Sequence, residues 1–408
     1  MRYNVRMANS RTSKNTSKKL VIAIIAIILI IAIAVAVIYF AAPDVFEQIV
    51  AVFSPDNKGT DDSTALERGE GELQIHFIDV GQGDSILILF PDGKDMLIDC
   101  GNKSTGYDFD ETAEYLDSYI TDGQLDYLML THSDEDHVSE LCKILDMYQV
   151  DTLFMPNILA EPTGTSATVL ELQAQIDALD SEKLALFTDK DTISTQAYAR
   201  FFIAALTEPD CTVTLTVDPD EDTNSIVITD GTLNAGGTYD GATYMLTFYC
   251  PTEEYYYESN LSSAEKKNAI SPIGVLEYNG FRIVLTGDSN EINEPTFVDR
   301  VGGELDCDVL KVGHHGSETS STEEFLDCID CEYAVISCNA AGNTFHHPRQ
   351  TTLDRFAARD MTVYRTDNNG NIVLTVGETL TFTVEKEVDA SVNLDGWTDE
   401  EIKADEAE

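Results

Sequence analysis

One short segment constrains this chain more than any other, because it places four potential metal ligands within six residues. The apolar run YLML is followed by THSDEDH (131–137), after which a helical pattern begins. At a tight strand-to-helix turn the side chains of His132, Asp134 and Asp136 can point to one side, with His137 close by at the start of the helix. A capped helix N-terminus would explain the two aspartates but not the two imidazoles. The segment therefore predicts a metal site, with room for two ions.

The rest of the chain predicts a fold that places such a turn at the edge of a sheet. Apolar runs that predict strands are LQIHFIDV, DSILILF, DMLIDC, YLMLTH, TLFMPN, MLTFYC, GVLEYNG, FRIVLTGD, VLKVG, YAVISC, MTVYRT and NIVLTV. Helical patterns are expected at 112–120, 137–147, 168–179, 321–328 and 351–358. Strands interleaved with helices, with polar residues at strand ends, predict an α/β sandwich whose site lies along one edge of the sheets.

The order of these segments resembles the metallo-β-lactamase family, and in particular the extracellular domain of the ComEC/Rec2 DNA-uptake proteins. HSDEDH matches that family's variant H-x-D-x-D-H. Further resemblances, in the same order as in the family, are HFIDVGQGDSILI (76–88) with LIDCG (97–101), LTGD (285–288), LKVGHHGSETSS (310–321), NTFHHPRQTTLDRF (343–356) and YRTDNNGNIVLT (364–375). The resemblance covers about 72–385 apart from an inserted middle, and it implies the αββα sandwich of this family.

The resemblance also implies a centre of two divalent metal ions, either zinc or manganese. His132 and Asp134 would bind one ion, and Asp136 and His137 would bind the other. Asp288 in LTGD would bridge the pair. With an aspartate in place of a softer imidazole, and with no histidine between 137 and 314, the site of the first ion, which His132 and Asp134 would hold, is expected to be weak or to take Mn²⁺.

Residues of the other segments have expected roles around these ions. His314 and His347 are expected as the remaining ligands, which leaves His315 as a second-layer residue or general acid. Asp136 and His315 are the catalytic candidates, and Asp99 is expected to be structural. The residues expected to line the pocket are Asp79, Gln82, Asp84, Lys311 and Arg349. A well-made β-turn explains the first three of these almost as well.

Two departures from the family pattern bear on these assignments. The family's last histidine segment has Gly where this chain has His346, and the usual His-Gly-Gly type of continuation is replaced by VSE (138–140). The ligand set is therefore open at one imidazole.

Three functions are compatible with such a centre, in which two cations activate a shared water for attack on phosphorus or carbonyl carbon. The resemblance implies a phosphodiesterase, specifically a DNA nuclease related to competence DNA uptake, with DNA or another phosphodiester as its partner. The alternatives are a hydrolase of a small ester, lactone or cell-wall phosphoester, and a catalytically inactive surface binding module. Activity on bis-p-nitrophenyl phosphate without DNA cleavage would favour the second function, and a metal-free protein would favour the third. The sequence identifies no protein partner.

The charge balance bears on the nucleic-acid hypothesis. The chain has 73 acidic and 25 basic residues and a net charge of −48, which disfavours long-range steering of a polyanion. Lys311, Arg349 and Arg365 could still form a local phosphate clamp, although ordinary surface charge is the simpler explanation.

The N-terminal region predicts a single membrane anchor. Residues 1–19 carry six basic residues and no acidic ones, and the uncharged run 20–40 would span about 31 Å as a helix. A cleaved signal peptide is the alternative, but the run is longer than the usual h-region. The positive-inside rule then predicts a cytoplasmic segment 1–19, a transmembrane helix 20–41 and an extracellular remainder.

The extracellular remainder divides into four expected parts. Residues 42–71 are expected to form a flexible linker, and residues 72–387 the hydrolase domain. Residues 162–241, with at most one good helix, are expected to be an insertion, and the acidic tail 388–408 is expected to be disordered. The eight cysteines allow disulfides without requiring them, and the metal-knuckle spacing of Cys328 and Cys331 is a weak signal without a second pair.

Overall fold

The computed structural model describes residues 69, 71–102, 107–187, 195–217, 225–234, 237–253, 255, 263–339 and 344–405. The expected cytoplasmic segment, the expected membrane span and nearly all of the expected linker lie outside these residues. Within the described ranges, no helix has both the length and the apolar composition needed to cross a membrane.

The first of two large sheets has the strand order β17-β16-β1-β2-β3-β4-β5-β6 among the described residues. Its strands are β1 (Leu73–Phe77), β2 (Ile86–Leu89), β3 (Asp95–Ile98), β4 (Gln124–Met129), β5 (Gln149–Met155), β6 (Thr212–Leu215), β16 (Ile372–Val376) and β17 (Leu380–Val384). Strands β3 to β6 run parallel. The segments after β3 and β4, which are DCG and HSDEDH, therefore emerge at the same edge.

The second sheet has the order β15-β14-β13-β12-β11-β10-β7 among the described residues. Its strands are β7 (Ile226–Thr229), β10 (Tyr244–Tyr249), β11 (Ile273–Tyr278), β12 (Phe281–Leu285), β13 (Val309–Lys311), β14 (Tyr333–Ile336) and β15 (Thr362–Arg365). Strands β12 to β15 are parallel, so LTGD after β12 and VGHHG after β13 also share one edge. A small hairpin is formed by β8 (Thr232–Leu233) and β9 (Tyr239–Asp240).

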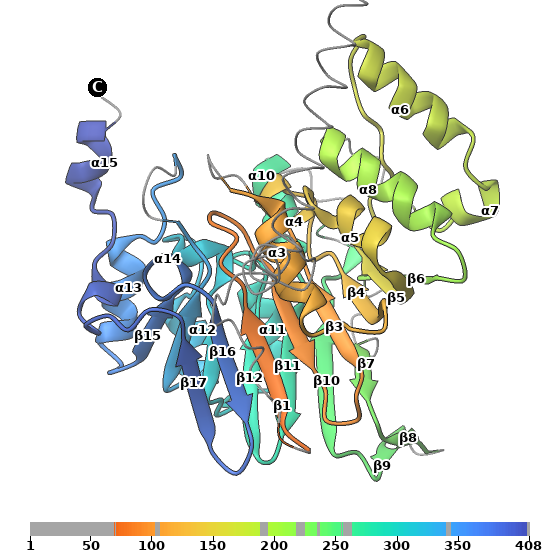
Figure 1. Cartoon of the computed structure of the whole chain (residues 1–408). Helices are drawn as coiled ribbons and strands as arrows, with labels where there is room; N and C mark the ends of the chain where they lie inside the picture. The colour runs from red at the N-terminus through yellow and green to blue at the C-terminus, as the bar shows by residue number, and fades with distance from the viewer. Residues whose placement is uncertain are drawn as a thin grey trace, which may run out of the picture. The chain divides into compact units, whose positions relative to one another are not determined.

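Helices cover the outer face of each sheet (Figure 1). The helices of the described residues are α3 (Phe109–Asp117), α4 (Glu135–Val138), α5 (Leu141–Met147), α6 (Ala167–Asp177), α7 (Ser181–Leu184), α8 (Gln196–Thr207), α10 (Ser263–Ala269), α11 (Glu294–Val301), α12 (Glu323–Ile329), α13 (Gln350–Ala357), α14 (Thr366–Asn369) and α15 (Asp399–Asp405), with 3₁₀ turns η1 (Gly313–Gly316) and η2 (Val392–Leu394). Of these, α6, α7 and α15 stand away from the sheets (Figure 1). The five predicted helices are confirmed, with the one at 137–147 divided into α4 and α5.

The buried side chains fall into three layers that match this arrangement. The central layer joins the two sheets through residues such as Phe77 and Leu374 from the first and Leu246 and Ile283 from the second. One outer layer packs α3, α5 and α8 on the first sheet, and the other packs α11, α12 and α13 on the second. Each fully buried Leu, Ile or Phe contributes about 1.5–3 kcal/mol relative to exposure. The predicted α/β sandwich, with helices outside two sheets, is confirmed.

Two expectations about less regular segments are wrong: that 162–241 holds at most one good helix, and that the tail is disordered. The segment 162–241 contains α6, α7 and α8, and its strands β6 and β7 extend both large sheets, while its assignment as an insertion stays a prediction. Helix α8 is held by buried Tyr198, Phe201 and Phe202, whose spacing fits one helix face. The tail is ordered through residue 405: Asn393 Nδ2 donates to Val363 O at 2.7 Å, and η2 packs beside β15. The backbone of Trp397 also pairs with that of Pro348 and Gln350, and such contacts, which composition does not reveal, explain the order of the tail.

Candidate metal centre

The predicted ligands come together where strands β4, β12 and β13 end. HSDEDH follows β4 and forms the short helix α4, Asp288 follows β12, and both histidines of HHGS lie in η1 after β13. Helix α10 lies beside α4 in Figure 1, and a contact between Lys267 and Asp134 joins the two. Segments far apart in the sequence thus converge on one edge of the sandwich.

Two glycines allow the backbone to close around α4. A Cβ at Gly101 would lie 2.2 Å from the backbone of Asp136 and His137, and one at Gly83 would lie 2.4 Å from the carbonyl oxygen of Gly101. The amide of Asp84 donates to the carbonyl of Asp136 at 3.1 Å. The GQGD and DCG segments therefore require glycine for close approach, and they press α4 into the site.

The two oxygens of Asp288 divide the nearby histidines into two pairs. Its Oδ2 lies 3.6 Å from His132 Nε2 and 3.8 Å from His314 Nε2. Its Oδ1 lies 3.1 Å from His137 Nε2 and 3.7 Å from His315 Nε2. One buried carboxylate therefore faces two imidazoles with each of its oxygens.

Hydrogen bonds fix the orientation of the His137 ring. Its Nδ1 lies 2.8 Å from Asp99 Oδ2, so that Nε2 faces Asp288. Asp99 also accepts hydrogen bonds from the amide of Thr131 at 2.8 Å and from its hydroxyl at 2.7 Å. Asp99 is therefore structural, as expected, but it is also the residue that orients a predicted ligand.

Contacts at Nδ1 also orient the rings of His315 and His132. Nδ1 of His315 donates to the carbonyl of Ser337 at 2.9 Å, which leaves Nε2 3.5 Å from Asp136 Oδ2. Nδ1 of His132 lies 3.3 Å from the hydroxyl of Ser271, whose oxygen also accepts from the amide of Asp288. Each Nε2 is thus turned toward the centre of the cluster.

The pKa shifts show how strongly charge is concentrated here. Burial lowers the pKa of His132 to about 4, with His137 adding to the effect. Burial opposes protonation of His137 as well, but the carboxylates of Asp288 and Asp99 outweigh it and raise the pKa of His137. Burial would raise the pKa of Asp288, yet the histidines around it, His137 foremost, hold that pKa well below its usual range. The cluster is therefore built to bind cations, whether protons or metal ions.

The spacing of the ligand atoms fits a metal ion. Bonds of about 2.1 Å at tetrahedral angles separate neighbouring ligand atoms by about 3.4 Å, and the distances around Asp288 run from 3.1 to 3.8 Å. The ligand atoms of His132, His137 and Asp288 lie within 4.8 Å of one another, as do those of Asp136, His137 and His315. Within the described part of the chain, no hydrogen bond reaches the buried Nε2 of His132 or of His315. A cation bound beside each of these atoms would satisfy both of them.

Comparison with known proteins agrees with this geometry. The metallo-beta-lactamase superfamily profile matches residues 78–233. The chain is 26% identical over 317 residues to ComE operon protein 3 of Bacillus subtilis (strain 168), covering 74% of this chain and 33% of that protein. It is 38% identical over 98 residues to the competence protein ComA of Neisseria gonorrhoeae, covering 24% of this chain and 14% of that protein. The profile match and these two similarities bear out the resemblance to the metallo-β-lactamase superfamily that the sequence motifs indicate.

The chain spans a third or less of the length of those two curated relatives. Among solved structures, the metallo-beta-lactamase fold protein YhfI from Bacillus subtilis is similar, with a TM-score of 0.41 and 11% identity. That alignment covers 75% of this chain and 100% of the other.

The remaining predicted ligands lie on the outer side of the candidate metal centre. The ring of His347 packs edge-on against that of His314, with centroids 5.0 Å apart. Asp134 Oδ2 lies 3.8 Å from His132 Nε2. His314 and His315 both have left-handed backbone conformations, with φ of 48° and 53°. Such strain in two consecutive non-glycine residues is typical of functional sites, and here it decides which ring faces inward.

The contacts of Lys311, Arg349 and Arg365 argue against the phosphate clamp that the sequence left open, and the burial of Lys311 and Arg365 shows that these two are not ordinary surface charges either. Lys311 is fully buried, and its ammonium donates to Asp84 Oδ2 at 2.7 Å and to a backbone carbonyl. Arg349 pairs with Asp399 at 2.8 Å, on the side of the tail. Arg365 is buried and pairs with a neighbouring aspartate at 2.7 Å. Each cation is engaged by a carboxylate of the fold, so none of the three side chains presents a phosphate site.

The other expected pocket residues support the backbone around the site. Asp79 Oδ1 accepts from the amide of Gly81 at 3.1 Å, as in a β-turn. Gln82 Oε1 accepts from the amide of Asn339 at 3.3 Å. Asp84 Oδ1 lies 3.5 Å from His315 Nδ1, one layer away from the centre.

Sequence reasoning missed the segment 267–271, which includes the end of α10. Lys267 pairs with Asp134, and the side-chain nitrogen Nδ2 of Asn268 lies 3.2 Å from His314 Nδ1. Ser271 contacts His132, as described above. The signal that could have found this segment is its cluster of polar residues directly before an apolar strand, as at the other strand ends of the site.

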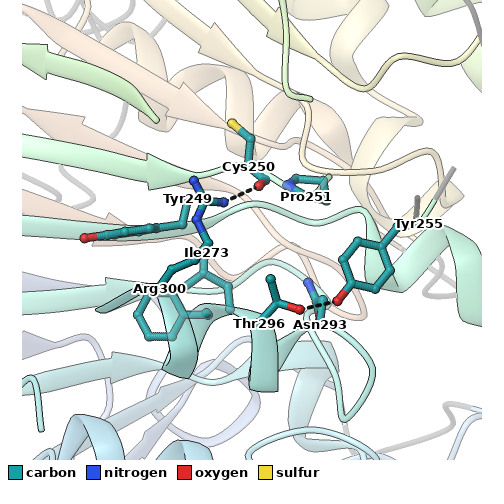
Figure 2. A pocket seen from close by; sticks show the side chains of 9 residues that line it. Tyr249, Cys250, Pro251, Tyr255, Ile273, Asn293, Thr296 and Arg300 are labelled. Atoms are coloured by element: carbon teal, nitrogen blue, oxygen red, sulfur yellow. Dashed lines mark hydrogen bonds between the residues drawn. The ribbon is translucent and has the colours of Figure 1, made fainter. Parts of the chain in front are cut away.

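A small cavity lies away from this cluster, between β10 and α11 (Figure 2). Its walls include Tyr249, Tyr255 and Arg300 and none of the predicted metal ligands. The guanidinium of Arg300 donates to the carbonyl of Cys250 at 2.7 Å.

All eight cysteines of the chain are free thiols.

Proposed function

We propose that this chain is a membrane-anchored phosphodiesterase that binds two divalent ions and cleaves DNA outside the cell. The observation that carries the proposal is the position of Asp288, whose two oxygens each face a pair of imidazoles. A carboxylate in this position is suited to bridge two ions.

The distances suggest one ligand set for each ion. His132, Asp134 and His314 would hold one ion together with Asp288 Oδ2. Asp136, His137 and His315 would hold the other together with Asp288 Oδ1. This assignment makes His315 a ligand, where the sequence favours a second-layer role, and leaves His347 as a support for His314.

Divalent ions bound there would supply a water activated near neutral pH and positive charge for a developing oxyanion. The chain's own residues orient the imidazoles: Asp99 fixes His137, and the carbonyl of Ser337 fixes His315. A mixture of carboxylates and imidazoles suits either Mn²⁺ or Zn²⁺.

The curated relatives support DNA as the substrate, because two of them are named for competence or its operon. The proposed anchor at 20–41 rests on the apolar run and on the basic residues before it. Protease accessibility of the domain on intact cells tests the extracellular topology.

Metal content and cleavage, measured on the full chain, test the function. We expect about two ions per chain by mass spectrometry, together with Mn²⁺- or Zn²⁺-dependent cleavage of plasmid DNA and bis-p-nitrophenyl phosphate. Asp288→Ala is expected to lose both metal and turnover, whereas Asp146→Ala, at an exposed position of α5, is expected to keep them.

The possible outcomes separate the three functions. Turnover of bis-p-nitrophenyl phosphate without DNA cleavage would replace the nuclease with a hydrolase of small substrates. A protein without metal or turnover would refute the enzyme and leave a binding module.

A further inference from the structure

One cation lies directly against the predicted ligands. The ammonium of Lys267, in α10, forms an ion pair with the carboxylate of Asp134. The two residues are 133 positions apart in the sequence, so the fold alone creates this contact.

The pair lies on the open side of the metal centre. The side chains of His314, Asp134 and Lys267 are 24%, 20% and 17% exposed, whereas those of His132 and His137 are 0% exposed. Among these five side chains, the three partly exposed ones are therefore those that solvent and a substrate can reach directly.

The position of Lys267 is set by the same segment that supports the ligands. Its neighbour Asn268 contacts His314, and Ser271 contacts both His132 and the amide of Asp288. The backbone that carries Lys267 is therefore held against the ligand cluster, and the ion pair with Asp134 places its ammonium beside a predicted ligand.

We propose that Lys267 binds the anionic phosphoryl group of the substrate, an inference that rests on the proposed function. When Asp134 shares its charge with a divalent ion, the ammonium of Lys267 has a second cation as its neighbour. Like charges at such short range repel, and an anion placed between them is attracted by both. A phosphodiester presents that anion, and a neutral ester does not.

The surroundings make this cation the one suited to the task. Lys267 is also paired with a carboxylate, but its partner Asp134 is a predicted metal ligand. Lys311 and Arg349 are paired with Asp84 and Asp399, which lie outside the proposed ligand sets. In a chain of net charge −48, attraction of a phosphate must come from local charge.

The experiment uses the full-length, metal-loaded chain and its variants Lys267→Met, Lys267→Gln and Lys267→Arg. Lys403→Met, at an exposed position of α15, is the matched control. Inorganic phosphate is titrated by calorimetry, and metal content is measured on each sample. Kinetics compare bis-p-nitrophenyl phosphate with the neutral ester p-nitrophenyl acetate.

Loss of one charge-assisted hydrogen bond predicts about tenfold weaker phosphate binding in Lys267→Met and Lys267→Gln. KM for bis-p-nitrophenyl phosphate is expected to rise by a similar factor, with metal content and KM for the neutral ester unchanged. Lys267→Arg and Lys403→Met are expected to bind phosphate as the wild type does.

Two results would overturn the inference while leaving the proposed function intact. One is unchanged phosphate affinity in both Lys267→Met and Lys267→Gln with their metal retained. The other is loss of metal in these variants, which would make Lys267 a positioning residue for Asp134. A wild-type chain without metal would instead refute the proposed function, and this inference with it.

Discussion

Replacing Asp99 with asparagine tests how the chain orients His137, a predicted metal ligand, through a residue that lies outside the proposed ligand sets. Asp99 is buried and accepts three hydrogen bonds, two from Thr131 and one from Nδ1 of His137. With the proton on Nδ1, the Nε2 lone pair of His137 is free to bind a cation. The backbone of Asp99 has a φ of 57°, a conformation that asparagine also tolerates, so Asp99→Asn should keep the fold.

The expected magnitude follows from the exchange of one acceptor for a donor. If the asparagine oxygen accepts from Thr131, its amide N–H faces Nδ1 of His137 and drives the ring proton to Nε2. Loss of such an orienting partner costs about 10–100-fold in metal affinity. Loss of a charge-assisted hydrogen bond lowers the unfolding free energy by about 1.5–3 kcal/mol.

The assay is competition with a chelator for Mn²⁺ or Zn²⁺, accompanied by urea unfolding. Asp95→Asn is the matched control, because Asp95 lies at the opposite end of the same strand β3, where it accepts from the amide of Asp126 at 3.0 Å. A folded Asp99→Asn protein whose metal affinity lies within about twofold of the wild type, against the 10–100-fold loss expected, would refute the reasoning.

Two further predictions concern stability. Burial raises the pKa of Glu294, which accepts from the amides of Ser321 and Thr322, to about 7 from an ordinary 4.5. Because the pKa is higher in the folded state, the contribution of Glu294 to the unfolding free energy is full below pH 4.5 and is lost as pH rises through about 7, a change on the order of 3 kcal/mol. Glu294→Gln should abolish that part of the pH dependence in urea unfolding. An unchanged pH profile would contradict the prediction. Asn393→Ala should lower the unfolding free energy by about 1–3 kcal/mol by removing the donor to Val363, and no change would show that the tail does not stabilise the domain.

The ligands could be found from the sequence because parallel strands place their carboxyl ends at one edge. His132, Asp288 and His315 each follow an apolar run, and the fold needs only those runs to be adjacent for the side chains to meet. The sequence could not show which of the rings of His314 and His315 points into the cluster, because this depends on the left-handed backbone conformations of both residues. Lys267 also escaped notice, because no periodic pattern ties α10 to the turn before α4.

Lys311 shows the opposite error, in which a motif suggests a role that packing forbids. The sequence places it beside HHGS and close to the site, where a cation would suit a phosphate. A residue in the middle of a parallel sheet is buried on both faces, however, and a buried ammonium requires a carboxylate partner. Asp84 provides that partner, at 2.7 Å.

An acidic chain is compatible with an anionic substrate, because screening by salt limits the distance over which a protein charge acts on that substrate. At physiological ionic strength the Debye length is about 8 Å, so most of the negative surface is screened from a phosphate held at the centre. That surface slows the approach of a polyanion, which is an effect on association rate. The charges that would contact a bound phosphate are those of Lys267 and of the proposed ions, and they would set its affinity. A net charge of −48 therefore disfavours fast capture of DNA and leaves its cleavage possible.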